Sequence, residues 1–269
     1  MSRMGPVRVG RGIGRPAGAA FAGGGGGGGA APSWPNEPAG WTLLADTTWE
    51  AADVGAWTSG TRDGWSQKFL DATRDASIET VGDSIIGESR AMTYTYPVDH
   101  TGGGGVETFL TVGGTYRSIY LGMYVKLSAN WYGHGASGIN KLAYIRTAGA
   151  GSPLMWVEYR AVGAAQPLEP YMVDQMVGGS GGITTGLSSG YPLRGQWARV
   201  EMRLDLDAPR RVRYWVDGTL WIDNTTFTGS SSGERIIEVT LSGIMGGVGA
   251  SSNPEVQTMQ YDRVRVVAN

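Results

Sequence analysis

The residues that could perform acid–base chemistry gather between positions 131 and 146. His134 stands in the run WYGHG of residues 131–135, and Tyr144 and Arg146 lie on the strand expected directly after it. A histidine or tyrosine can abstract a proton next to a carboxylate while an arginine neutralises that carboxylate, so these three residues form a candidate acid–base cluster. A loop histidine followed by ordinary strand residues would give the same pattern, and this structural interpretation stays open.

A second group of candidates consists of aromatic side chains. The sequence holds 10 Trp and 12 Tyr against 4 Phe. Trp and Tyr combine an apolar ring with a polar edge, which suits both sugar rings and protein interfaces. We expect Trp131, Tyr132 and Trp156 to line a concave carbohydrate-binding face, with core packing as the alternative. Trp215 shares a strand face with two arginines, which predicts an exposed contact for a ligand or partner.

Other residue types limit the chemistry. The chain has no cysteine, which excludes a disulfide scaffold, a thiolate zinc site and a cysteine nucleophile. His100, beside Asp99 and a glycine run, is expected in a loop. Asp217, Asp223 and Asn224 follow no calcium-loop spacing, so no metal or other cofactor is assigned, although calcium stays possible. The net charge of −2 argues against a nucleic-acid partner, and the apolar runs are too short for a membrane helix.

The elements that must position these residues have a period of two. Residues 119–127 and 199–206 alternate apolar and polar side chains, which is the pattern of a half-buried β-strand. In the second stretch Glu201 and Asp205 alternate with two arginines, so we interpret them as a salt-bridged solvent face rather than a catalytic pair. The pair Asp217-Gly218 between alternating stretches predicts a hairpin turn, because both central positions need a positive φ.

Further strands are expected between glycine- and serine-rich breaks, at residues 141–146, 154–159, 236–241 and 259–267. Only residues 67–73 or a turn near 84–87 are candidates for a short helix. Many short strands without alternating helices predict an all-β protein, either a sandwich or a barrel. One sandwich of about 230 residues is the simplest architecture for a chain of this length.

The first 32 residues differ in composition from the rest. They contain Arg3, Arg8, Arg11 and Arg15, no acidic residue, and seven consecutive glycines at 23–29. Such a segment cannot bury enough apolar surface to offset its chain entropy, so we expect a flexible Gly/Arg-rich arm. It is either a solvated tail or an assembly device that orders against a partner subunit. The predicted organisation is an arm and linker over residues 1–39 and one β domain over 40–269.

Three segments carry a resemblance to a known superfamily: YRSIYLGMYVKLSANWYGHGASGINKLAYI at 116–145, GQWARVEMRLDLDAPRRVRYWVDGTLWIDNTTF at 195–227, and MQYDRVRVVAN at 259–269. Their motifs and order resemble the concanavalin A-like lectin/glucanase superfamily, closest to its polysaccharide-lyase-like and laminin-G-like members. The resemblance implies an antiparallel jelly-roll β-sandwich. Such domains serve as lyases, glycoside hydrolases, lectins and non-catalytic modules, so the fold does not choose among these functions.

Two activities that the resemblance implies can be compared with the residues present. A retaining glucanase would carry carboxylates in a pattern such as E-x-D-x-x-E, which is absent, so we do not expect a glucanase. A polysaccharide lyase would need a base and a residue that neutralises a uronate carboxylate. His134, Tyr144 and Arg146 are the candidates for these roles.

The function expected from these observations is non-catalytic. We expect a structural and binding protein of a phage virion, such as a capsid decoration, fibre or tail-associated subunit, whose arm binds copies of itself or a capsid or tail protein. An extracellular-type jelly roll without an apolar stretch typical of a signal peptide fits this expectation. Two alternatives stay open: a glycan-binding lectin module of an extracellular or cell-surface protein, and a polysaccharide lyase.

Overall fold

The structure is a computed structural model that describes the chain from residue 33 onward, with gaps. The described residues are 33–69, 75–83, 85, 89–100, 106–134, 138–148, 154–161, 167–175, 181–184, 194–225, 234–246 and 253–269. The four arginines predicted to serve in assembly, Arg3, Arg8, Arg11 and Arg15, lie outside this part of the chain, so their role stays a prediction.

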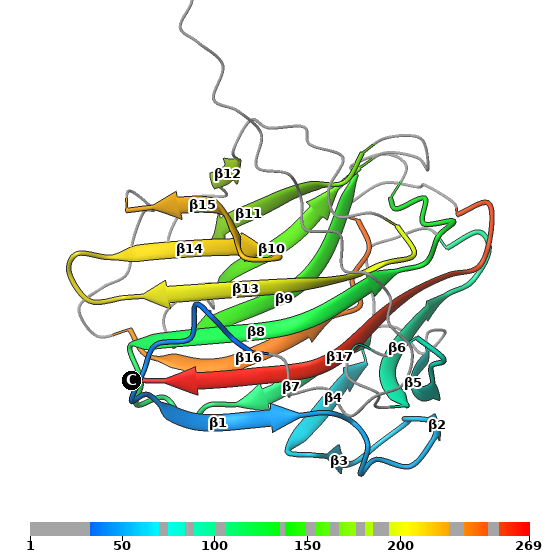
Figure 1. Cartoon of the computed structure of the whole chain (residues 1–269), viewed down its shortest axis with the longest axis horizontal. Coiled ribbons are helices and arrows are strands. Elements are labelled where there is room, and N and C mark those ends of the chain that lie inside the picture. The colour runs from blue at the N-terminus through cyan, green and yellow to red at the C-terminus, as the bar shows by residue number, and fades with distance from the viewer. Residues whose placement is uncertain are drawn as a thin grey trace, which may run out of the picture.

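Two antiparallel sheets form the domain (Figure 1). The larger sheet has nine strands in the order β15-β14-β13-β8-β17-β6-β5-β2, with β1 also paired to β17. Its central strands are long and carry the resemblance motifs. The bounds are β15 (Thr219–Asn224), β14 (Arg211–Val216), β13 (Trp197–Asp205), β8 (Ser118–Leu127), β17 (Gln257–Ala268), β6 (Arg90–Tyr96), β5 (Asp75–Thr80), β2 (Gly55–Ala56) and β1 (Thr42–Thr47).

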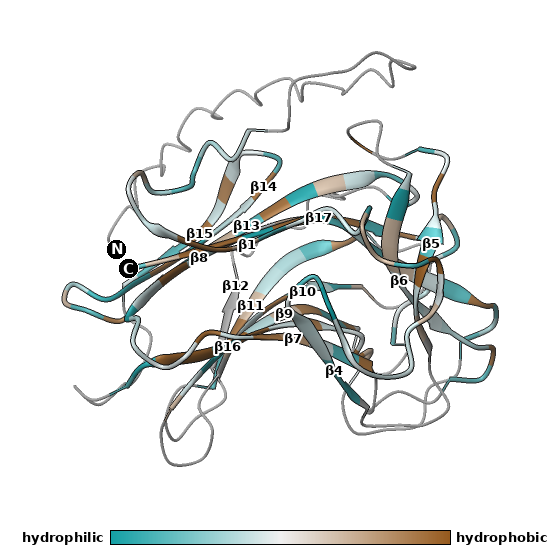
Figure 2. Cartoon of the chain, turned by 90° about the horizontal axis from the view of Figure 1, so that it is seen from below, coloured by the Kyte–Doolittle hydropathy of each residue, from teal (hydrophilic) through white to brown (hydrophobic). Residues whose placement is uncertain are grey.

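The second sheet has eight strands in the order β12-β11-β10-β9-β16-β7-β4-β3. Figure 2 shows the two sheets as stacked layers, with β8, β13 and β17 in one layer and β9, β16 and β7 in the other. The bounds are β12 (Gly181–Thr184), β11 (Glu169–Gln175), β10 (Leu154–Arg160), β9 (Ile139–Thr147), β16 (Ile236–Ser242), β7 (Val106–Thr111), β4 (Trp65–Phe69) and β3 (Thr61–Arg62).

The core lies between the sheets and is built from the alternating apolar positions that the sequence predicts. On β8, Ile119, Leu121 and Met123 are fully buried in one continuous cluster with apolar residues of both sheets. The all-β sandwich is therefore confirmed. The hairpin at Asp217-Gly218 is confirmed too, because both residues have a positive φ, of 47° and 81°, and they join β14 to β15.

The expected short helix is wrong where the structure describes it. Residues 67–69 belong to β4, which pairs with β7, so sheet pairing overrides the weak helical pattern there. Most of the other candidate stretch, 84–87, lies outside the described residues. The described part of the chain contains no helix long and apolar enough to cross a membrane.

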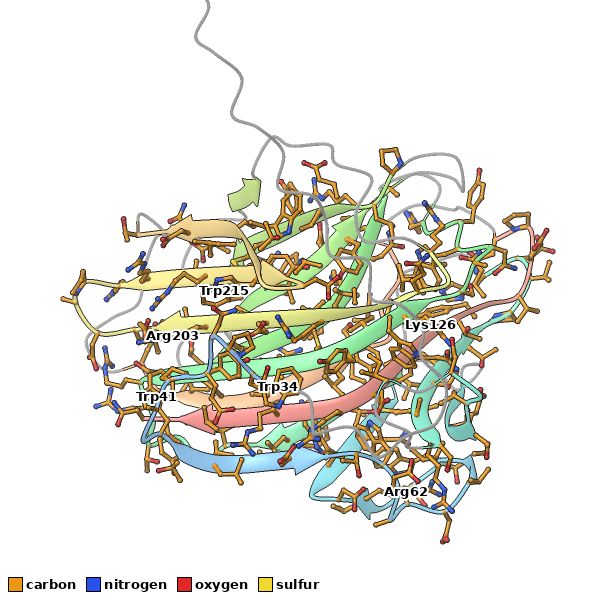
Figure 3. All side chains as sticks on the ribbon, viewed as in Figure 1. Trp34, Trp41, Arg62, Lys126, Arg203 and Trp215 are labelled. Carbon is orange, nitrogen blue, oxygen red and sulfur yellow. The ribbon has the colours of Figure 1, made fainter. Side chains whose placement is uncertain are left out.

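Residues 33–41, here called the N-terminal strap, lie on the outer face of the nine-stranded sheet. The Trp34 ring sits over Gly122, where a Cβ atom would come within 2.6 Å of it, and lies 5.4 Å from the Tyr124 ring. Figure 3 shows Trp34 and Trp41 of the strap beside β8 and β13. The missing side chain at Gly122 therefore makes room for the strap, most of which the sequence assigns to the linker.

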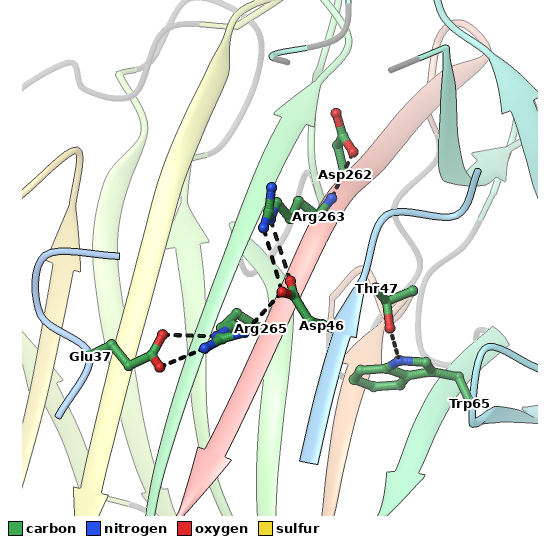
Figure 4. Close-up of polar contacts among 7 residues, drawn as sticks. All are labelled: Glu37, Asp46, Thr47, Trp65, Asp262, Arg263 and Arg265. Atoms are coloured by element: carbon green, nitrogen blue, oxygen red, sulfur yellow. Dashed lines mark hydrogen bonds and ion pairs between the residues drawn. The ribbon is translucent and has the colours of Figure 1, made fainter. Parts of the chain in front are cut away.

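Polar contacts also hold the strap. Glu37 accepts two hydrogen bonds of 2.9 Å from the Arg265 guanidinium, which in turn donates to Asp46 at 2.8 Å (Figure 4). The Asn36 amide donates to the buried Glu201 carboxylate at 3.1 Å. Paired charges and a half-buried tryptophan thus fix this segment on the sheet.

Candidate active site

A β-bulge decides which residues of β9 face outward from the eight-stranded sheet. On the neighbouring strand β10, Val157 pairs with Ala143 while Glu158 pairs with Lys141, so Leu142 is the extra residue. Leu142 and Ala143 both face the core. Lys141 is therefore brought onto the same outer face as Tyr144, although a regular strand would place residues three apart on opposite faces.

Lys141 lies on an aromatic surface without a carboxylate partner. Its Nζ atom is 4.7 Å from the centre of the Trp156 ring and 5.7 Å from that of Tyr144. Among the described residues it forms no ion pair within 4.0 Å, whereas Lys68 pairs with Glu238 and Lys126 pairs with Asp83. Burial lowers the pKa of Lys141, partly offset by the charges of nearby carboxylates, so its amine loses its proton more readily than an ordinary lysine does.

Tyr144 and Arg146 extend this arrangement along β9. The Ser242 hydroxyl on β16 donates a 3.0 Å hydrogen bond to the Tyr144 hydroxyl, and the backbone N–H of Ile244 holds Ser242 in place at 3.1 Å. Burial raises the pKa of Tyr144, so the phenol keeps its proton. The Arg146 guanidinium lies 5.6 Å from the Tyr144 ring and 3.0 Å from Glu238. The Lys141 amine, the Tyr144 phenol and the Arg146 guanidinium therefore follow one another along the outer face of β9.

Cations reach the surface of this face, and their carboxylate partners lie deeper. The side chains of Lys68, Arg146 and Arg160 are 37%, 25% and 34% exposed. The three glutamates beside them are 12%, 2% and 0% exposed, in the order Glu238, Glu107 and Glu158. Burial raises the pKa of Glu107, and its Oε1 atom has no hydrogen-bond partner among the described residues. The outer surface thus presents positive charge to an approaching ligand.

The aromatic and basic surface continues onto β10 and β11. The Trp156 indole donates to Glu158 at 2.7 Å, and Arg160 donates to the other oxygen of the same carboxylate at 2.6 Å. The Arg160 guanidinium also lies 3.4 Å from the centre of the Tyr171 ring. Aromatic rings backed by charged groups are suited to hold sugar units that carry negative charge.

The structure buries His134, one of the three residues of the predicted acid–base cluster. His134 is 0% exposed, and its ring packs so closely on Gly246 that a Cβ atom there would lie 2.1 Å from it. Tyr144 and Arg146, by contrast, share the outer face with Lys141. His134 is packed against Gly246, whereas Tyr144, although 2% exposed, lies beside the half-buried Lys141, so we place Lys141 rather than His134 in the candidate site.

The predicted sugar-stacking residues do not form one surface. Trp131 is 0% exposed in the main core, where its indole donates to Asn140 at 3.2 Å, so it cannot stack on a sugar. The loop residue Tyr132 is half-buried, and Gln257 accepts from its backbone N–H at 2.7 Å. Trp156 is on the outer face in a separate cluster with Tyr144. Trp156 is 5% exposed, so it too is not an open stacking surface, and it belongs to the candidate site through its contact with Lys141.

The residues flagged on the nine-stranded sheet lie on its outer face. Arg199 pairs with Glu201 at 2.9 Å, and Arg203 pairs with Asp205 at 2.9 Å, so the salt-bridged face is confirmed. Glu201 is nevertheless fully buried because the strap covers it. Trp215 is on the predicted face but only 6% exposed, so it is not the exposed contact that the sequence suggested. His100, expected in a loop, follows β6 outside any strand and is 5% exposed.

Sequence reasoning missed Lys141, Glu158, Arg160 and Tyr171. The scarcity of lysine was a usable signal: the chain holds three lysines, and one of them begins the strand that carries Tyr144 and Arg146. In a regular strand Lys141 and Tyr144 would lie on opposite faces, so alternation alone gives no reason to choose Lys141. Among the described residues no group of three or more His, Asp or Glu side chains could hold a metal ion, and calcium stays unassigned.

The fold and this basic, aromatic face together define the class of protein. The chain has the concanavalin A-like jelly-roll fold that the sequence resemblance implied. A variant of alginate lyase Aly36B bound to an alginate trisaccharide is similar, with 17% identity, 85% of this chain and 99% of that chain covered, and a TM-score of 0.65.

Two further lyases share the fold. An endo-β-1,4-glucuronan lyase from the fungus Trichoderma reesei is 17% identical, with 78% and 94% of the chains covered and a TM-score of 0.52. Alginate lyase vAL-1 from a Chlorella virus is 12% identical, with 77% and 93% covered and a TM-score of 0.54. No family model matches the sequence, and no curated protein matches it.

These comparisons correct the expectation of a non-catalytic virion subunit. Several of the similar structures are polysaccharide lyases, so the comparisons do not support a structural role in a phage particle. The virion role was expected in part from the composition of the Gly/Arg-rich arm. The composition of an N-terminal segment does not determine which side chains lie together on a sheet of the β domain.

Proposed function

We propose that this protein is a polysaccharide lyase that cleaves a uronate-containing polymer on the outer face of its eight-stranded sheet. The observation that carries the proposal is the Lys141 amine, which forms no ion pair within the described part of the chain and lies on the rings of Trp156 and Tyr144, next to Arg146 on the same strand. The similar lyases support the substrate class, because their names give alginate and glucuronan, which are polymers of uronic acids. Two structures of Aly36B bound to alginate oligosaccharides are of variants in which a lysine is replaced by alanine.

The reaction would be a β-elimination in which the chain supplies three groups. The neutral Lys141 amine removes the proton from the carbon next to the uronate carboxylate. The freed electron pair forms a double bond to the neighbouring carbon while the glycosidic C–O bond breaks. The Tyr144 hydroxyl gives its proton to the departing oxygen, and solvent later moves the proton from Lys141 back to Tyr144. No water is added to the products, so protons and electrons balance.

Arg146 would stabilise the charge that develops during this step. Proton removal converts the uronate carboxylate into a dianionic enolate, which a guanidinium stabilises more strongly than the ground state. Arg146 is tied at Nε to Glu238, and its Nη2 atom has a long contact of 3.8 Å to Glu107. The exposed end of the guanidinium is thus oriented by carboxylates and free to pair with a substrate carboxylate.

The test is a cleavage assay on alginate and polyglucuronate, with a neutral glucan as the control polymer. Elimination creates an unsaturated uronate that absorbs at about 235 nm. Replacing Lys141 with alanine is expected to lower kcat by about 10²- to 10⁴-fold, since a general base contributes about that much. Thermal unfolding should show that the variant is folded.

Lys126→Ala is the matched control. Lys126 also lies over a tryptophan ring, 4.9 Å from Trp197, but it is on the other sheet and pairs with Asp83. Its loss should leave cleavage unchanged. The proposal fails if no uronate polymer yields the unsaturated product, or if Lys141→Ala cleaves as fast as Lys126→Ala.

A further inference from the structure

Glu158 is a buried carboxylate beside the candidate base. It pairs in register with Lys141 across β9 and β10 and is 0% exposed. Each of its oxygens accepts from a different N–H donor: Trp156 Nε1 at 2.7 Å and Arg160 Nε at 2.6 Å. A carboxylate is required for this arrangement, because a glutamine would present an NH₂ group to one of the two donors.

The tryptophan that Glu158 holds is the ring on which Lys141 lies. The Lys141 Nζ atom is 4.7 Å from the Trp156 ring, which also meets the Tyr144 ring edge-on at 6.1 Å. The hydrogen bond from the indole N–H to Glu158 fixes the orientation of the Trp156 ring. The ring in turn restricts the positions that the Lys141 amine can occupy. Glu158 therefore acts on Lys141 in two ways. It fixes the Trp156 ring that contacts the amine, and its negative charge stabilises the ammonium form.

The charged groups around Lys141 come from three strands. Glu158 on β10 provides the largest stabilisation of the ammonium form, followed by Glu107 on β7, and Arg146 on β9 itself opposes them. Tyr144 stays neutral because burial raises its pKa. Burial of the amine is the largest effect and lowers the pKa of Lys141. Glu158 is thus the main carboxylate working against that burial.

We propose that Glu158 is a positioning residue that fixes the Trp156 ring next to the Lys141 amine and sets the pH at which that amine becomes available as a base. This inference rests on the proposed function, in which Lys141 removes the proton. It assigns to Glu158 no contact with substrate.

The chain offers a direct measurement, because Lys68, Lys126 and Lys141 are its only lysines. Reductive methylation with ¹³C-formaldehyde gives one NMR signal set for each lysine and one for the N-terminal amine, and Lys141→Arg identifies the signal of Lys141. In Glu158→Gln the titration midpoint of Lys141 should move to lower pH while those of Lys68 and Lys126 stay in place. The acidic limb of the kcat/KM profile should move in the same direction.

Trp156→Phe separates positioning from charge. It keeps a ring and the Glu158 carboxylate but removes the indole N–H, so the Lys141 midpoint should stay nearly unchanged. The ring is then no longer fixed, and kcat/KM should fall by about tenfold or more. This variant also keeps the inference testable if Glu158→Gln does not fold.

The outcomes are distinct. A folded Glu158→Gln with an unchanged Lys141 midpoint would overturn the charge effect, and full activity in Trp156→Phe would overturn the positioning effect. The titration needs no substrate, so it is independent of the cleavage assay. A wild-type protein that cleaves no uronate polymer, yet shows the expected Lys141 shift, would refute the lyase proposal and support the effect of Glu158 on the amine.

Discussion

The outer faces of the two sheets use similar residues in different ways. Arg203 on the nine-stranded sheet pairs with Asp205 and lies 4.7 Å from the Trp41 ring, just as Arg160 on the eight-stranded sheet pairs with Glu158 and lies 3.4 Å from Tyr171. On the nine-stranded sheet, however, the tryptophan belongs to the strap, and Lys126 there has a carboxylate partner. The eight-stranded sheet instead holds Lys141, which forms no ion pair among the residues that the structure describes.

Charge pairing, rather than the presence of aromatic and basic residues, thus distinguishes the structural face from the face that we propose to be reactive. Figure 4 shows the structural case, where Glu37, Arg265, Asp46 and Arg263 form a continuous chain of paired charges. Such pairing leaves no group that needs a ligand. In contrast, Lys141 forms no ion pair within 4.0 Å among the described residues, and we propose it as the group that transfers a proton.

After the loss of activity in Lys141→Ala, the next largest effect is expected on the stability of the protein. It concerns Asp262, a buried carboxyl on β17 of the nine-stranded sheet. Burial raises the pKa of this carboxyl to about 6. The folded state therefore binds its proton more tightly than the unfolded chain, and stability is lost as pH rises from about 4 through about 6. Asp262→Asn should stabilise the protein above about pH 7 by up to about 3 kcal/mol, with no gain below about pH 4, as measured by urea unfolding at both pH values. A gain at acidic pH would contradict this.

A smaller effect is expected from Trp34→Ala, which removes the ring that anchors the strap. The half-buried side chain contacts Gly122 and Tyr124, so its loss should cost about 2 kcal/mol in thermal or urea unfolding. The cleavage rate per folded molecule should not change. If it falls, the two faces are coupled and the comparison drawn above breaks down.

The matched variants Arg160→Ala and Arg203→Ala test directly whether the outer faces of the two sheets differ in substrate binding. Arg160 is expected to hold an anionic sugar unit next to Tyr171, so its loss should raise KM for a uronate polymer about tenfold, or about 1.4 kcal/mol. Arg203, with similar contacts on the other sheet, should have no effect on KM. Steady-state kinetics with both variants checks this, and equal KM values would remove Arg160 from the binding surface.

The sequence by itself determined most of the fold. Alternation at residues 119–127 and 199–206 sets the faces of β8 and β13, because one face of each strand must leave water. Asp217-Gly218 sets its hairpin for a local reason, the need for positive φ. The acid–base role suggested for Tyr144 and Arg146 stays a prediction, but their placement on one face follows from the same period of two.

Only the tertiary structure decided where the candidate base lies. Lys141 comes onto the face of Tyr144 because Leu142 is an extra residue opposite β10, and a bulge depends on the pairing of two strands rather than on local sequence. The burial of His134 and of Trp131 likewise depends on contacts with segments distant in the sequence. The His134 ring, for example, packs on Gly246. Alternation predicts the face of a regular strand, but the register between strands determines which side chains meet.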